Sequence, residues 1–447
     1  MPKNPETNYD VVVVGAGAGG ICAALASART GAKTLLIERS ETIGGTGVHS
    51  PVSLICKFHG SDHRPINLGI HRELFPHAYL HSTRDKRPGA KRLTYDEKEL
   101  AQTYERLVAA ESKLSVITGT GVTEAIREGS RIERLRLEDG SEVSAPCFVD
   151  STADGNLADM AGCPSEKGRS TDGSLQSATL TFTLGNIDKS KLKVPRFDTR
   201  GSLESFWAEM KPIYKEAQAR GETINPKSSV VCFPYPDGER MLFNANEVVG
   251  VDPTVPGSVE AGRKKAEQMV HELITILRRH PALKDATVDF VSTWLGVREG
   301  RRITGDYVLT EEDCLGEARF EDMLAACAYE IDIHDPSGKS TRMVDIPGSG
   351  YYHIPYRSLI AANAENLLLG SRCISGTHEA HSSYRVISGV TAIGQAAGTA
   401  AALAARYTEG KTRAIPASWS RYVLREQVQF VEGSTEAPPD WDSPTAG

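Results

Sequence analysis

The sequence predicts an α/β protein in which a Rossmann-like domain is built from the N- and C-terminal segments of the chain, with an α+β mixed-sheet domain inserted between them. Three observations carry this prediction: a strand–glycine turn–helix pattern over 11–30, short buried strands at 147–150 and 366–370, and a helix of very small residues over 389–406. The 447 residues are 40% hydrophobic, which is enough for two or three domains with sizeable cores.

The first pattern begins with four consecutive valines, 11–14, which predict a strand buried on both faces. A G-x-G-x-x-G motif follows over residues 15–20, and the expected cofactor contacts in it are Gly15, Ala16, Gly17, Ala18 and Gly20. Its first glycine allows a tight turn, its second lets a pyrophosphate approach the backbone, and its third lets the helix pack on the strand. The helix that follows presents free N–H groups to a pyrophosphate at its N-terminus. The pattern therefore predicts a Rossmann-like dinucleotide-binding domain.

A second apolar strand, 33–37, ends at Glu38, whose carboxylate can accept hydrogen bonds from ribose hydroxyls. Glu38 also disfavours a 2′-phosphate at this position, because two anions would meet. Arg39 and the glycine loop Gly44-Gly45-Thr46 follow directly, and we expect them to contact the same cofactor.

Residues 49–95 form a predicted excursion on the substrate side that holds six of the twelve histidines. Two pairs have metal-ligand spacing, His59-x-x-x-His63 and His77-x-x-x-His81, but the first encloses glycine and serine, which form a poor helix. We therefore predict no metal site. The basic residues between 84 and 92 are interpreted as a solvated loop, with steering of an anionic substrate as the alternative.

Predicted helices and strands continue to alternate up to residue 165. They predict a helix over 96–111, a strand over 114–118, and a hairpin around Asp139-Gly140. The strand 147–150 then enters a second glycine turn, 151–155, which again suits a nucleotide. Val122, Thr152 and Asp154 are the expected cofactor contacts here. Residues 1–165 are thus the first part of the dinucleotide-binding domain.

The pattern changes at about residue 166. Residues 166–350 predict an α+β mixed-sheet substrate domain, with a half-buried strand at 177–184, paired strands at 230–234 and 241–245, and a helix over 259–279. Residues 351–431 return to the first domain through the strand 366–370, a polar loop over 372–385 and the small-residue helix. We expect the tail, 432–447, to be disordered.

Composition excludes several classes of protein. The net charge of −7 does not indicate general binding to nucleic acid or to membranes. No apolar run reaches the length of a membrane span. The eight cysteines lie far apart without a C-x-x-C pair, which predicts free thiols. No apolar signal region precedes the first strand, so a cytoplasmic location is expected.

Several blocks together carry a resemblance. They are Gly15 to Glu38, Asp150-Ser-Thr-Ala-Asp-Gly155, Gly300-Arg-Arg-Ile-Thr-Gly-Asp-Tyr-Val-Leu309, Ile354-Pro-Tyr-Arg-Ser-Leu359, and Asn366-Leu-Leu-Leu-Gly-Ser-Arg372 with Gly389 to Ala405. Over most of 9–430 the chain resembles FAD-dependent oxidoreductases of the glutathione-reductase-like flavoprotein superfamily. The resemblance implies a Rossmann-like FAD-binding domain made of the N- and C-terminal segments, with Arg372 also at the cofactor. It further implies that the helix start, Gly389-Val390-Thr391, faces the flavin pyrimidine ring.

Some family patterns are missing. No second G-x-G-x-x-G follows a strand, so no separate NAD(P)H domain is indicated, and the lack of C-x-x-C disfavours a disulfide reductase. The flavin performs electron transfer, and the protein must supply orientation and a proton acceptor.

Histidine suits the role of proton acceptor, because its pKa lies near working pH. The loop before the last helix holds the candidates His378, His381, Tyr384 and Arg385. His378-x-x-His381 as a metal pair lacks an evident third ligand.

Two further sites are candidates for catalysis or binding. Arg298, with Arg301 and Arg302, can bind a carboxylate or phosphate, or can instead form salt bridges between domains. His49 follows the second glycine loop and is a candidate either for a covalent link to the flavin or for a side chain that faces the substrate.

The function predicted from these features is oxidation of an alcohol or amine C–H bond in a small polar metabolite, by hydride transfer to FAD. O₂ or another electron acceptor would then reoxidise the flavin. Two alternatives stay open: a flavin reductase or dehydrogenase fed by NAD(P)H or another donor, and a flavin-bearing protein that mainly binds a partner. The sequence leaves the substrate and the oligomeric state undetermined.

Overall fold

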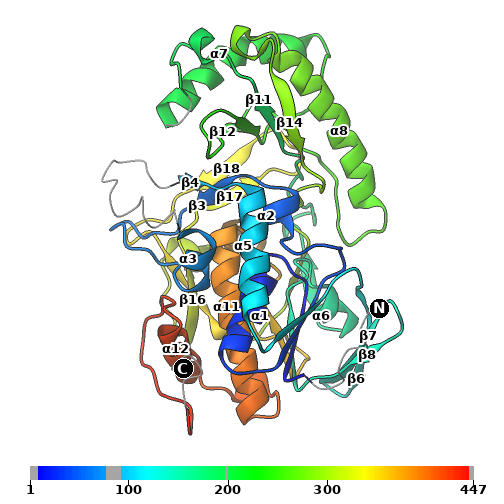
Figure 1. Ribbon diagram of the computed structural model, residues 1–447, viewed down its shortest axis with the longest axis vertical. Coiled ribbons are helices and arrows are strands. Elements are labelled where there is room, and N and C mark those ends of the chain that lie inside the picture. The colour runs from blue at the N-terminus through cyan, green and yellow to red at the C-terminus, as the bar shows by residue number, and fades with distance from the viewer. Residues whose placement is uncertain (1–8, 77–91, 197–199, 442–447) are drawn as a thin grey trace.

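The structure is a computed structural model, which describes residues 9–76, 92–196 and 200–441. Figure 1 shows a larger lower part, where helices α1, α5 and α11 lie together, and a smaller upper part that carries helices α7 and α8. We call the upper part the cap. The β17–β18 hairpin lies between the two.

A parallel sheet forms the centre of the lower part. Within the described ranges it holds five strands in the order β20-β9-β1-β2-β5. Their bounds, in chain order, are β1 Val11–Val14, β2 Thr34–Ile37, β5 Leu114–Ile117, β9 Cys147–Asp150 and β20 Leu367–Leu369. Because β2 and β9 lie on opposite sides of β1, the chain reverses direction across the sheet there. In such sheets the ligand binds at that point, outside the carboxyl ends of the strands.

Two helices, α1 (Ala18–Arg29) and α11 (Ile387–Tyr407), pack against each other, and both also contact strands of this sheet. A Cβ at Gly394 would lie 2.0 Å from the Gly19 carbonyl oxygen, and one at Gly398 would lie 2.0 Å from that of Ala23. The glycines therefore allow the helix backbones to touch, as the sequence predicted. In the described ranges α11 alone is long and apolar enough to cross a membrane, but 94% of its apolar window is buried inside the protein.

Smaller elements surround the central sheet. The predicted hairpin is present as three antiparallel strands in the described ranges: β6 Val122–Glu128, β7 Arg131–Leu137 and β8 Glu142–Val143. A second antiparallel pair consists of β3 Leu54–Cys56 and β4 Arg92–Thr94. The accompanying helices are α2 Thr46–His49, α3 Ile70–Leu74, α5 Glu97–Ala110, α6 Asn156–Met160 and α12 Ala417–Glu426. Asp96 caps α5 by accepting hydrogen bonds from two backbone N–H groups, which explains where that helix begins.

The cap is an antiparallel sheet with helices packed on it. The strand order over the described residues is β12-β13-β11-β14, with bounds β11 Phe182–Gly185, β12 Cys232–Pro234, β13 Met241–Phe243 and β14 Thr287–Val291. Its helices are α7 Arg200–Ala219 and α8 Ser258–Leu277. This part has its own apolar core, from Ala178 to Leu295, in which Phe182 and Phe243 stack with ring centroids 5.1 Å apart.

The chain between the cap and β20 packs on the lower part. Its elements are β15 Arg301–Ile303, paired with β10 Ser165–Lys167, then α9 Glu311–Leu315, β16 Met323–Cys327, β17 Ile331–His334, β18 Thr341–Val344, β19 Tyr352–Pro355 and α10 His378–Tyr384. Short 3₁₀ turns lie at Lys189–Lys191, Pro281–Leu283, Tyr356–Ser358 and Thr412–Ala414.

The structure differs from the sequence prediction in four places. The second core ends at Leu295, whereas the predicted substrate domain ran to 350, because the residues from Ile303 to Ile346 join the first core. The segment 177–184 is buried throughout rather than half-buried. The expected polar loop 372–385 contains helix α10, which the Thr377 side chain caps. Residues 432–441 of the expected disordered tail are placed, and Trp441 Nε1 donates to Glu426 at 2.9 Å. The rest of that tail lies outside the described residues.

Candidate functional site: a dinucleotide cradle beside a buried charge cluster

The carboxyl ends of the sheet strands meet at one edge, and the predicted binding residues follow them directly. β1 leads into Gly15, β2 into Glu38, β9 into Ser151 and β20 into Gly370. Gly15 has a φ of +97°, and a Cβ there would lie 2.5 Å from the Ser151 carbonyl oxygen. The first motif position therefore requires glycine, and the turn after β1 packs on the turn after β9.

In the described residues, no side-chain hydrogen bond caps the N-terminus of α1. Gly17 is its N-cap residue. A Cβ at Gly17 would find no described atom within 4 Å, whereas a Cβ at Gly20 would lie 1.7 Å from the Gly15 carbonyl oxygen. The third glycine is thus required by packing, while the second borders open space. An uncapped helix N-terminus beside open space suits a pyrophosphate.

Glu38 is held beside this turn by backbone groups. Its Oε2 accepts the N–H of Ala16 at 2.6 Å, and its Oε1 accepts the N–H and the hydroxyl of Ser40, both at 2.9 Å. Carboxylate oxygens can each accept two hydrogen bonds, so Oε2 retains a lone pair. The arrangement fixes the carboxylate and leaves capacity for a ribose hydroxyl.

The second glycine loop forms another wall of the same site. Gly44 and Gly45 have φ values of +119° and +55°, and the Gly44 N–H donates to the Ala16 carbonyl at 2.8 Å. A Cβ at Gly45 would lie 2.8 Å from the Gly17 Cα. Thr46 begins α2 and is exposed. We call the residues 15–20, Glu38 and 44–46 the dinucleotide cradle.

The other predicted cofactor residues flank the cradle. Arg39 is exposed, and its stem lies beside the residue that precedes Val122. The Thr152 hydroxyl donates to the carboxylate at the end of β9 at 2.7 Å, and Asp154 forms an ion pair with Arg372 at 2.8 Å. The Asp154–Arg372 pair ties the turn after β9 to the turn after β20. Direct contact of these five residues with a cofactor stays a prediction.

The start of α11 is reached through a tight turn from α10. A Cβ at Gly389 would lie 2.3 Å from the Tyr384 carbonyl oxygen, and Val390 is buried. The Thr391 hydroxyl lies 2.9 Å from His71 Nδ1 and donates to the Ser388 carbonyl at 3.0 Å. The excursion therefore packs on the helix start. A role for this start at a flavin ring stays a prediction.

The candidate residues of α10 are packed inside the protein. His378 Nδ1 lies 2.9 Å from Glu299 Oε1, and the Tyr384 hydroxyl donates to the Ile374 carbonyl at 3.1 Å. His381 is 0% exposed, and neither of its ring nitrogens has a hydrogen-bond partner among the described residues. Burial and nearby arginines lower its pKa well below the usual value, so it is neutral. The proposed base role of these residues stays a prediction, and a base must reach the proton that it removes.

His49 connects the cradle to the cap. Its Nε2 lies 3.0 Å from Thr42 Oγ1, its Nδ1 lies 3.4 Å from Thr293 Oγ1, and its ring stacks on Trp294 with centroids 4.2 Å apart. Burial lowers its pKa, although Glu38 acts in the opposite direction. Both proposed roles of His49, a covalent flavin link and a substrate contact, stay predictions.

Two of the three candidate arginines form structural contacts. Arg301 pairs with Asp159 at 2.9 Å, and Arg302 pairs with Glu299 at 2.5 Å while donating to two backbone carbonyls. Binding of a carboxylate or phosphate by these two arginines stays a prediction.

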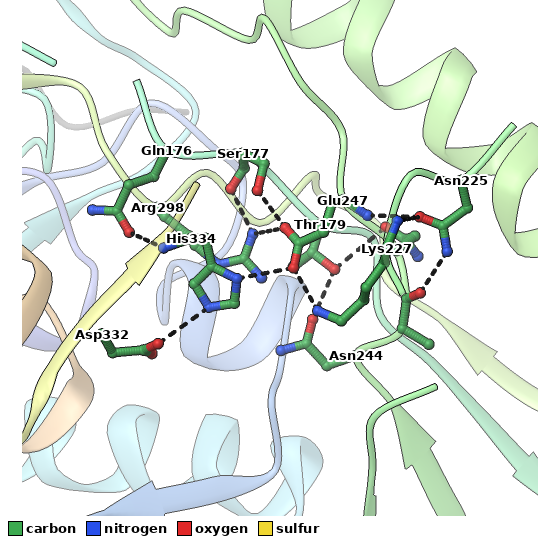
Figure 2. Close-up of polar contacts among 12 residues, drawn as sticks. Gln176, Ser177, Thr179, Asn225, Lys227, Asn244, Glu247, Arg298, Asp332 and His334 are labelled. Carbon is green, nitrogen blue, oxygen red and sulfur yellow. Dashed lines mark hydrogen bonds and ion pairs between the residues drawn. The ribbon is translucent and has the colours of Figure 1, made fainter. Parts of the chain in front are cut away.

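Arg298 differs, because it joins a buried group of charges where the cap meets the lower part (Figure 2). We call this group the charge cluster: Lys227, Glu247, Arg298, Asp332, His334 and Arg385. Glu247 lies at its centre, 2.5 Å from Lys227 Nζ, 3.0 Å from Arg298 Nη1 and 2.9 Å from His334 Nδ1. The Arg298 Nη2 is buried without a partner among the described residues. Two cations from separate segments and one histidine from β17 thus converge on the Glu247 carboxylate.

The cluster continues from β17 to the turn before α11. His334 Nε2 lies 3.6 Å from Asp332 Oδ1, and Arg385 Nη2 lies 3.5 Å from Asp332 Oδ2 and donates to its carbonyl at 3.1 Å. Burial alone would raise the pKa of both carboxyls, but the cations outweigh it. Arg298, His334 and Lys227 lower the pKa of Glu247, and His334 and Arg385 lower that of Asp332. Both carboxylates are therefore ionised at neutral pH.

The described residues contain no group of three or more side chains suited to hold a metal ion. His59 is half-buried, and burial lowers its pKa to about 4, while His63 is exposed with a φ of +65°. The second candidate pair, His77 and His81, lies outside the described residues.

Sequence reasoning missed four members of the charge cluster, namely Lys227, Glu247, Asp332 and His334. One signal was available: Ile331-Asp-Ile-His334 alternates apolar and titratable residues, which places both titratable side chains on one face of a strand. Lys227 and Glu247 carry no comparable signal, because only the folded cap brings them together.

Comparisons with known proteins agree with the cradle. The family model described as "FAD dependent oxidoreductase" matches residues 10–421. A 36-residue segment is 72% identical to digeranylgeranylglycerophospholipid reductase of Methanocaldococcus jannaschii, and it covers 8% of this chain and 9% of that protein. A 48-residue segment is 46% identical to thioredoxin reductase of Aquifex aeolicus, and it covers 11% of this chain and 15% of that protein. The matches thus span only a small part of these two curated relatives.

A solved structure is also similar. It is a geranylgeranyl bacteriochlorophyll reductase-like protein of Thermoplasma acidophilum, with a TM-score of 0.45 and 13% identity, covering 94% of this chain and 84% of that one. The open space at Gly17, the uncapped N-terminus of α1 and the fixed Glu38 carboxylate fit the pyrophosphate and ribose of FAD.

Proposed function

The chain belongs to the FAD dependent oxidoreductase family, and on this basis we propose that it oxidises a C–H bond beside a hydroxyl or amino group of a small polar molecule. When bound, FAD supplies a two-electron acceptor for the hydride. The chain's own residues must then bind the substrate, exclude water and accept the proton from its O–H or N–H group. O₂ or another acceptor would regenerate the cofactor.

One observation carries this proposal: charged side chains gather between the cap and the turn that starts α11. A polar substrate needs hydrogen-bonding and charged partners when it leaves water. Among the sequence candidates, Arg298 and Arg385 belong to this cluster. His378, His381 and Tyr384 contribute to the packing of α10, so we propose that they orient the turn, with transfer of the substrate proton to His381 as the alternative.

Anaerobic screening of metabolites tests the proposal. The purified protein should carry FAD, and an alcohol or amine should bleach its absorbance near 450 nm, whereas hydrocarbons should not. NADH and NADPH belong in the same screen, because rapid bleaching by either one alone would favour the reductase alternative. Flavin that no donor reduces would overturn the enzymatic proposal and favour a flavin-bearing binding protein.

A further inference from the structure

His334 differs from the other buried histidines in how its two ring nitrogens are placed (Figure 2). Its Nδ1 lies 2.9 Å from Glu247 Oε1, within hydrogen-bond distance. Its Nε2 lies 3.6 Å from Asp332 Oδ1, which is too far for a hydrogen bond. The side chain is 12% exposed, whereas that of His378 is 4% exposed and His381 is fully buried. Of these three, His334 alone combines an anchored nitrogen with partial exposure.

We propose that His334 is the residue that accepts the substrate proton, with Glu247 anchoring its Nδ1; this inference rests on the proposed function. Bound FAD would supply the two-electron acceptor for the hydride, which would leave the substrate carbon with both electrons of its C–H bond. The O–H or N–H proton of the substrate passes to His334 Nε2, and a C=O or C=N bond forms. One hydride and one proton leave the substrate, so atoms and charge balance.

The carboxylate of Glu247 fixes the tautomer that this role needs. A carboxylate accepts a proton from Nδ1, which leaves the lone pair of a neutral imidazole on Nε2. When Nε2 takes up a proton, Glu247 and Asp332 stabilise the imidazolium. Lys227 and Arg298 from the cap, together with Arg385 from the end of α10, oppose that charge.

The position of His334 relative to α11 is held by its strand. Two residues earlier, the backbone N–H of Asp332 donates a hydrogen bond to the Ser382 hydroxyl oxygen at 3.2 Å, and Arg385 donates to the Asp332 carbonyl. α10 packs on β17 as a whole. Because Arg385 is the C-cap residue of α10 and Val386 is the N-cap residue of α11, His334 is tied to the turn that joins the two helices.

The kinetic test compares His334→Gln with His381→Gln in the full-length FAD-loaded protein. Once a reducing metabolite is known, His334→Gln should keep its FAD but be reduced about 100-fold more slowly, since a general base contributes roughly 10²–10⁴-fold. Added imidazole or high pH should restore part of the rate. His271→Gln, an exposed position on α8, is the matched control and should behave as the wild type. A wild-type rate in His334→Gln, with full FAD content, would overturn the inference and leave the proposed function intact.

A second measurement does not depend on turnover. Diethyl pyrocarbonate modifies accessible, unprotonated imidazole nitrogens, and peptide mass spectrometry assigns the modified residue. In the FAD-loaded protein His334 should react faster than His378 and His381, which are packed in the core. Equal or slower modification of His334 would contradict its greater exposure. Failure of every donor to reduce wild-type FAD would instead overturn the proposed function, and the catalytic role of His334 with it.

Discussion

The cradle and the charge cluster are built on opposite principles. The cradle consists largely of backbone: glycines whose missing Cβ atoms leave room, an uncapped helix N-terminus, and one carboxylate held by N–H groups. The cluster consists of side chains, in which Glu247 is only 3% exposed and neutralises cations that come from distant segments. A backbone site tolerates variation around it, whereas a side-chain site changes when any of its members changes. If the charge cluster binds substrate as proposed, cofactor binding and substrate chemistry lie in parts of the fold that can vary separately.

The largest expected effect is on the stability of the cluster. Glu247→Ala should lower the free energy of unfolding by about 3–5 kcal/mol, because removing one partner of a buried ion pair leaves uncompensated buried charges. Lys227 and Arg298 would both lose their carboxylate. Urea unfolding followed by circular dichroism measures this loss, and FAD content should remain near that of the wild type in the folded protein.

An exposed ion pair supplies the matched control for this variant. Arg263 and Glu267 lie 2.8 Å apart on α8, with side chains 41% and 48% exposed. Glu267→Ala should cost about 0.5 kcal/mol or less, since water screens such pairs. Equal losses in the two variants would show that the cluster is hydrated and open rather than buried.

The cradle should respond in the opposite way. Gly17→Val should weaken FAD binding by about 100-fold, or about 3 kcal/mol, because its side chain would fill the space that the pyrophosphate needs. The ligand-free protein should unfold near the wild-type midpoint, since a Cβ there meets no described atom within 4 Å. Isothermal titration with FAD and thermal unfolding of the ligand-free form separate the two effects. Normal FAD affinity would mean that the pyrophosphate lies elsewhere.

These opposite principles explain what the sequence could predict. The cradle residues all lie within a stretch of 32 positions, from Gly15 to Thr46, and their spacing in the sequence predicted them. Glu247 and His334 are 87 positions apart, and their contact depends on how the β17–β18 hairpin meets the cap. The α10 helix was missed because its polar sequence resembles a loop, although burial on both sides stabilises it. Arg298 was found through its type, but its partners required the structure.

The excursion, residues 49–95, packs on the start of α11. Its buried His71 should make the stability of the folded protein depend on pH. Burial lowers the pKa of His71 from 6.5 to about 3. Below pH 6.5 the unfolded chain therefore binds a proton that the folded protein does not bind, so stability falls as pH falls. Between pH 7 and pH 5 this residue should cost about 2 kcal/mol. Thermal unfolding at both pH values should show a smaller loss in His71→Asn, and an unchanged slope would mean that the ring is hydrated.

The smallest expected effect tests whether the two regions are linked through Arg385. This residue belongs to the cluster through Asp332 and directly precedes the helix that packs on α1 of the cradle. Arg385→Lys keeps the positive charge but loses the planar fork, and with it the hydrogen bond to the Asp332 carbonyl. The loss should be about 1 kcal/mol of stability, the usual value for one hydrogen bond. FAD affinity should not change if the regions are independent, because the cradle is held by its own glycine contacts. A parallel fall in FAD affinity, measured by titration calorimetry, would show that the α10–α11 turn transmits strain from the substrate side to the cofactor.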